Sequence, residues 1–76
     1  MERILMSNNM RRESDRLLEQ IGRADSMVIA IKAGIRAEGF VLGLETAGSL
    51  GAGDANNLNI IFEAALENRL KSLALN

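Results

Sequence analysis

The sequence predicts an all-α protein built as a helical hairpin, and three observations support this fold class. Proline is absent from the 76 residues. The apolar residues, 47% of the chain, are mostly Ala, Leu, Ile, Val and Met, a composition typical of packed helices. Two long segments also place apolar side chains at helical spacing. We therefore expect a long first helix, a glycine-rich corner and a second helix.

The first helix is expected to run from about Met10 to Ala47, because apolar or small residues recur in alternating steps of four and three. These residues are Met10, Ser14, Leu17, Ile21, Ala24, Val28, Ile31 and Ile35. We expect residues 1–9 to be a flexible N-terminal leader and 10–76 to be a single helical domain. Glycine disfavours a helix by roughly 1 kcal/mol relative to alanine, so a bend is expected near Gly39.

The apolar runs MVIAI (27–31) and FVLGL (40–44) leave one alternative open. They could be two short β-strands in an α+β fold, since short apolar runs do not distinguish a strand from a buried helix. Helix is favoured because Gly39, Gly43 and Ala47 are spaced by four, which creates a smooth strip that another helix can approach closely.

The stretch GFVLGLETAGSLGAGDANN (39–57) holds five of the seven glycines and is predicted to be a corner between two helices. Its spacing matches neither GxGxxG nor the P-loop pattern, and Asp54 would repel a phosphate. Gly48 can adopt the left-handed conformation that ends a helix, and Leu50 can pack back over the last turn. Asp54 adds a negative charge at the start of the next helix.

The second helix is expected from about Ala55 to Leu73. One broad apolar stripe consists of Leu58, Ile61, Phe62, Ala65, Leu66, Leu70 and Leu73. Glu67 precedes Lys71 by four residues, the favourable order for an ion pair on a helix surface.

The charge pattern argues against a membrane protein and predicts a cytoplasmic one. The net charge is −1, and MERILMSNNMRR lacks the apolar core of a signal peptide. Lys32, Arg36 and Glu38 interrupt the most apolar run, and each is costly at bilayer depth.

Enzymatic activity is not expected, because the chain has no His, Cys or Tyr, the side chains that most often act as acid, base or nucleophile. No cofactor or metal is expected either. The carboxylates of Glu63 and Glu67, and of Glu13 and Asp15, are interpreted as solvated helix faces.

The segment AEGFVLGLETAGSLGAGDANNLNIIFEAALENRL (37–70) resembles the helix, Ala-Gly-x-Leu corner, helix ending of many small accessory proteins encoded by bacteriophages and prophages. In such endings Ser or Thr often caps the second helix, whereas this chain has Gly51-Ala52-Gly53. The resemblance implies a small helical dimer that binds a host protein, such as a transcription activator, a motility or pilus component or a defence complex. It assigns no functional residue.

We therefore hypothesise a non-enzymatic interaction protein, a homodimer in a four-helix arrangement that binds and inhibits or regulates a host protein. The expected dimer or partner interface comprises Val28, Ile31, Ile35, Gly39, Phe40, Gly43, Leu44 and Phe62. The alternative is a small dimeric nucleic-acid-binding transcriptional regulator. Its basic patch would comprise Arg11, Arg12, Arg16 and Arg23.

Overall fold

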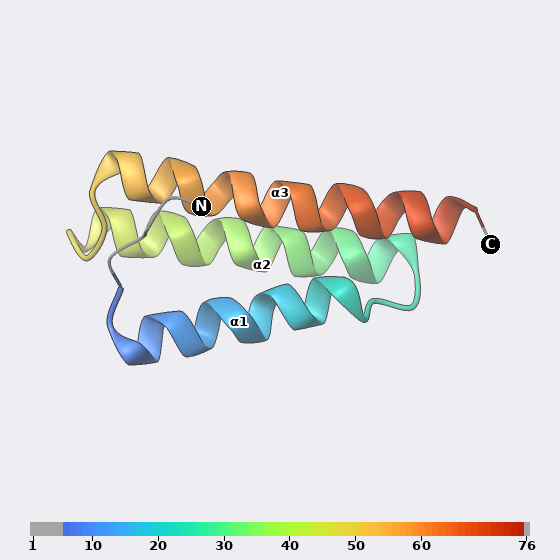
Figure 1. Cartoon of the computed structure of the whole chain (residues 1–76), viewed down its shortest axis with the longest axis horizontal. Coiled ribbons are helices and arrows are strands. Elements are labelled where there is room, and N and C mark those ends of the chain that lie inside the picture. Colours follow the sequence, from blue (N-terminus) through green and yellow to red (C-terminus); the bar gives the residue numbers. More distant parts are fainter. Residues whose placement is uncertain (1–5, 76) are drawn as a thin grey trace.

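The computed structural model describes residues 6–75, which form three α-helices. They are α1 (Asn8–Gly22), α2 (Met27–Thr46) and α3 (Ala52–Ala74). Figure 1 shows an up-down-up bundle in which α1 and α3 run in one direction and α2 runs in the other. Each helix contacts both of the others, and α2 and α3 share the most extensive contact. The all-α prediction is confirmed for the described residues.

The predicted long first helix is instead two helices, because the chain leaves the helical conformation between Gly22 and Met27. Ser26 caps α2: its hydroxyl accepts a hydrogen bond from the backbone N–H of Ile29 at 3.2 Å. The apolar spacing in steps of four and three continues across this break, because the small residue Ala24 occupies the next position of the series and is buried in the loop. The two-helix hairpin is therefore corrected to a three-helix bundle.

The predicted N-terminal leader lies only partly within the described residues, since 1–5 fall outside them. Met6 packs against the core, and the hydroxyl of Ser7 accepts a hydrogen bond from the N–H of Met10 at 3.2 Å. Helix α1 begins at Asn8, two residues earlier than expected.

Helix α2 is continuous, so the segments 27–31 and 40–44 are both helical and the alternative of two strands is excluded. The helix also passes through Gly39 without a break. Its fully buried residues are Ala30, Ala33, Ala37 and Val41, three of which are alanine. A Cβ atom added at Gly34 would lie 2.8 Å from Cδ2 of Leu66, so α2 and α3 approach closely there.

The glycine-rich corner forms as predicted. Gly48 has a φ of 76°, the left-handed conformation that glycine adopts without strain. The carbonyl of Leu44 accepts hydrogen bonds from the N–H groups of Ser49 (2.8 Å) and Leu50 (3.3 Å). The Leu50 side chain is buried against the core. Gly51 occupies the N-cap position of α3 and therefore offers no side-chain cap.

The core lies along the centre of the bundle and draws on all three helices. It consists of Leu17, Ile21, Ala33, Ala37, Val41, Leu50, Ala55, Leu58 and Phe62. Within residues 6–75, no helix has both the length and the hydropathy needed to cross a membrane.

Candidate interaction surface

Most of the large apolar side chains of α2 are exposed. We name four of them the outer stripe, and their exposed fractions are Val28 62%, Ile31 46%, Ile35 63% and Leu42 63%. The opposite face, which packs on α1 and α3, combines small side chains such as Ala33 and Ala37 with the larger Phe40, Val41 and Leu44. A helix usually buries its large apolar residues, whereas α2 leaves most of them exposed.

The outer stripe is a single line because its members are three, four and seven residues apart. Val28, Ile35 and Leu42 are spaced by seven, and Ile31 lies four residues before Ile35. The buried residues Ala30 and Ala37 lie on the other side of the same helix. Neither α1 nor α3 covers the outer stripe, so it is available to a partner.

A shallow groove runs beside the outer stripe, between α2 and α3, with a volume of about 130 Å³. Its lining residues are Ile31, Gly34, Ile35, Glu38, Asn59, Phe62, Glu63 and Leu66. Both ionisable side chains in the lining, Glu38 and Glu63, are acidic. The groove therefore extends the apolar surface of the outer stripe toward α3 and carries negative charge.

The structure divides the eight predicted interface residues into two groups. Five lie on the outward side of α2 or at its exposed glycines: Val28, Ile31, Ile35, Gly39 and Gly43. The other three pack inward: Phe62 is buried, and Phe40 and Leu44 are half-buried against the core.

In the single chain Phe40, Phe62 and Leu44 therefore contribute to the core, and their assignment to a partner interface stays a prediction. Phe40 and Leu44 share the face of α2 that carries Ala33 and Ala37, so they fill the space that the small residues leave. Sequence reasoning also missed Leu42, although its seven-residue distance from Ile35 was a usable signal.

The predicted basic patch lies on exposed positions of α1 and in the loop that follows, but acidic side chains neutralise part of it. The guanidinium of Arg16 donates two hydrogen bonds to Glu13, at 2.6 and 3.0 Å. Arg23 forms an ion pair with Glu19 at 3.4 Å. Arg16 thus pairs with the carboxylate three residues before it, and Arg23 with the carboxylate four residues before it.

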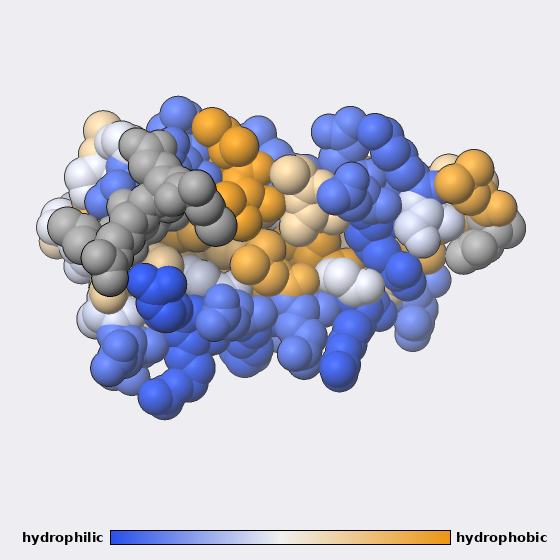
Figure 2. Space-filling model, viewed as in Figure 1, coloured by the Kyte–Doolittle hydropathy of each residue, from blue (hydrophilic) through white to orange (hydrophobic). Residues whose placement is uncertain are grey.

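The hydrogen bond from Arg16 holds the pKa of the Glu13 carboxyl below its ordinary value, and Glu13 in turn raises the pKa of Arg16. Figure 2 shows that hydrophilic side chains cover the outer edge of α1, while hydrophobic surface appears as a band between α1 and α3. This face of α1 is therefore a mixed-charge surface, since carboxylates and guanidinium groups alternate along it.

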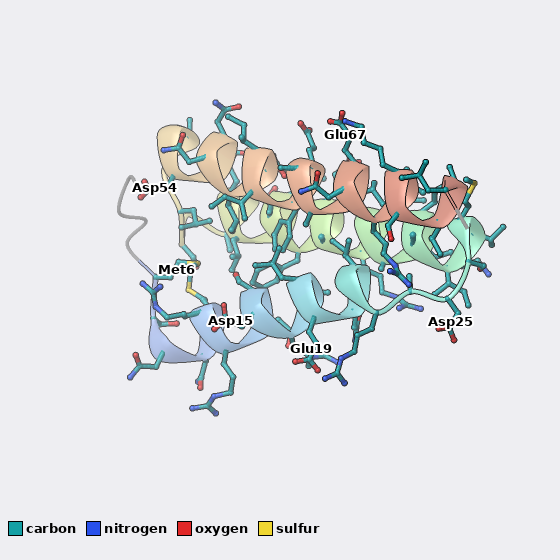
Figure 3. The ribbon with its side chains drawn as sticks, turned by 45° about the vertical axis from the view of Figure 1, so that its right-hand side comes forward. Met6, Asp15, Glu19, Asp25, Asp54 and Glu67 are labelled. Atoms are coloured by element: carbon teal, nitrogen blue, oxygen red, sulfur yellow. The ribbon has the colours of Figure 1, made fainter. Side chains whose placement is uncertain are left out.

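The carboxylates are dispersed over the bundle. Figure 3 shows Asp15 and Glu19 on α1, Asp25 in the loop, Asp54 at the start of α3 and Glu67 farther along the same helix. Glu67 pairs with Lys71 at 3.1 Å, as the sequence predicted. In the part of the chain that the structure describes, no group of three or more His, Cys, Asp or Glu side chains comes together.

The geometry defines a class of molecule, a small three-helix bundle in which α2 presents a line of large aliphatic side chains to the outside. Comparison with family models, with curated protein sequences and with solved structures finds no match. The functional assignment therefore depends on the surface itself.

Proposed function

We propose that this chain is a non-enzymatic interaction protein that works as a homodimer and binds a host protein, which it inhibits or regulates. The observation that carries this proposal is the outer stripe. Burying one large aliphatic side chain contributes roughly 1.5–3 kcal/mol, whereas a small domain has only about 5–15 kcal/mol of total stability. Four exposed aliphatic side chains in one line are therefore a substantial source of binding energy.

Composition and charge support the same proposal. The chain has no His, Cys or Tyr, and its net charge of −1 gives no strong field toward nucleic acid. Contiguous apolar surface on a small domain is typical of a protein interface. A helix that exposes residues at i, i+3 and i+7 is suited to packing against another helix. The resemblance of residues 37–70 to phage accessory proteins supports a host protein as the target.

The test is capture of host proteins by the purified chain, immobilised through a tag at its C-terminus. Ile35→Lys places a charge in the centre of the outer stripe, and Ser72→Lys, at an exposed position of α3, is the matched control. The expected result is a defined host protein that binds the wild type and Ser72→Lys but not Ile35→Lys. Equal capture by all three forms, or none by the wild type, would contradict the proposal.

A further inference from the structure

We propose that the outer stripe is self-complementary and pairs with the outer stripe of a second copy, with the two α2 helices antiparallel and the two-fold axis at Ile35. This inference rests on the proposed function and specifies its geometry. It follows from the order of large and small residues on either side of Ile35, from the open space at the exposed glycines and from the position of the charges.

The order of residue sizes is complementary about Ile35. In the antiparallel arrangement, residues equally far from position 35 lie at the same level on the two helices. Val28 is seven residues before Ile35 and Leu42 seven after it, so two aliphatic side chains meet at that level. Four residues away, Ile31 meets Gly39 of the second copy. At the two ends of the contact, a large side chain therefore lies level with another large one. Between the ends and Ile35, Ile31 lies level with a glycine.

The glycines leave room for this packing. A Cβ atom added at Gly39 or at Gly43 would meet no other atom within 4 Å, so the surface above both is open. On a helix, the four residues at i, i+3, i+4 and i+7 surround a hole that can receive a side chain of a facing helix. Ile35, Glu38, Gly39 and Leu42 form such a hole, and it is level with Ile31 of the second copy.

The charges favour the antiparallel direction. A parallel two-fold pair would set Glu38 directly against Glu38 of the second copy, since equal positions then lie at equal levels. Like charges at a helix interface repel. The antiparallel arrangement instead puts Glu38 level with Lys32 of the second copy, because each is three residues from Ile35. Both side chains are exposed in the single chain.

The extent of the contact is also consistent with a second copy. Ile35 is near the middle of α2, so an axis at this residue lets positions 27–43 of the two helices overlap. Binding to a helix of an unrelated protein would not require aliphatic residues of the outer stripe at equal distances on either side of Ile35. The resulting dimer would contain six helices, rather than the four that a two-helix chain would give.

The test uses single cysteines, because the chain has none of its own. A disulfide forms only when two Cβ atoms approach to roughly 3.5–4.5 Å. With the axis at position 35, Ile35→Cys should cross-link to itself under mild oxidation. A mixture of Val28→Cys and Leu42→Cys should give the mixed dimer, which its mass distinguishes from either homodimer. Each of these links should form at least about tenfold faster than the link of exposed Ser72→Cys, because association holds the thiols together.

Two cross-linking results would overturn the inference. Self-linking of Val28→Cys and of Leu42→Cys without the mixed product would indicate a parallel pair. Rates no faster than that of Ser72→Cys would indicate that the outer stripe does not meet its own copy.

Sedimentation equilibrium supplies an independent measurement. Ile35→Glu should raise the dissociation constant of the dimer at least ~100-fold, since two carboxylates would be buried beside each other. Its circular dichroism should equal that of the wild type, because Ile35 is exposed in the single chain. A wild type that stays a folded monomer even at about 100 µM would overturn self-pairing. Host-protein capture by the wild type separates the two failures: a dimer that captures no host protein contradicts only the proposed function, and a monomer that captures one contradicts only self-pairing.

Discussion

The guanidinium of Arg69 donates two hydrogen bonds, at 2.9 and 2.7 Å, to the carbonyl oxygen of Ala24, 45 residues earlier in the chain. Ala24 is buried in the loop between α1 and α2, and Arg69 reaches it from the second half of α3. The contact gives a buried carbonyl the partner that water cannot supply. It also ties the loop at one end of α1 and α2 to the third helix.

Replacing Arg69 by Met should therefore lower the free energy of unfolding by about 1.5–3 kcal/mol, the usual range for a hydrogen bond to a charged group. Met keeps an aliphatic stem but cannot donate. The measurement is urea denaturation at pH 7. The control is Lys71→Met, which removes only the exposed pair with Glu67 and should cost less than about 1 kcal/mol. Equal losses for the two variants would show that the contact with Ala24 does not stabilise the loop.

Gly48→Ala should destabilise the fold by about 1–2 kcal/mol, because a side chain strains the left-handed conformation seen at this residue. Space is not the reason, since a Cβ there would meet no other atom within 4 Å. Gly53→Ala is the matched control: it lies in the first turn of α3 with similar open space and should be neutral or stabilising by up to about 1 kcal/mol. Thermal unfolding of the two variants, followed by circular dichroism, measures the difference. A stabilising Gly48→Ala would be inconsistent with the corner described above.

The pair between Glu13 and Arg16 predicts a pH dependence with a definite sign. The pKa of Glu13 is lowered in the folded chain, mainly by the hydrogen bond from Arg16. Its contribution to stability is therefore present above the pKa of the unfolded chain, about 4.3 for an ordinary glutamate, and is lost as the pH falls through the folded pKa. Glu13→Gln should lower the unfolding midpoint slightly at pH 7. At pH values below both the folded and the unfolded pKa of Glu13, the substitution should leave the midpoint unchanged. A difference that grew on acidification would have the wrong sign.

The mixed charge of α1 predicts weak binding to polyanions. Arg16 and Arg23 each have an acidic partner on the same helix surface. We expect no retention on heparin at physiological salt and no specific binding to duplex DNA. The alternative of a nucleic-acid-binding regulator predicts the opposite, a measurable affinity that falls steeply as salt is raised. Charge removal by Arg12→Gln would then reduce both the affinity and the salt dependence.

Local patterns in the sequence were sufficient for the corner and for the third helix. Gly48 and Leu50 adopt the roles expected of them because a helix C-terminus followed by a turn depends on only a few neighbouring residues. The stripe through Leu58 and Phe62 faces the core because one side of α3 is clearly polar. In both cases the physical cause acts within a few residues.

The break before Met27 could not be predicted in the same way. Ala24 continues the seven-residue pattern, and Ser26 can equally be a surface residue within a helix or an N-cap. The bond from Arg69 to Ala24 favours the break, but it joins residues that are far apart in the chain. The inward orientation of the Phe40 side chain likewise depends on contacts with distant parts of the chain. Helix α2 is apolar on both faces, so spacing alone does not say which face α1 and α3 will cover.

The alanines on the inner face of α2 place different demands on sequence divergence than the outer stripe does. Enlarging Ala33 or Ala37 would push tightly packed helices apart, so folding itself restricts these positions. Folding of the single chain sets no comparable limit at Val28, Ile35 or Leu42, where polar residues could be substituted at little cost. If descendants of this protein kept an aliphatic residue at each of these three sites, this would therefore indicate selection for binding to another molecule.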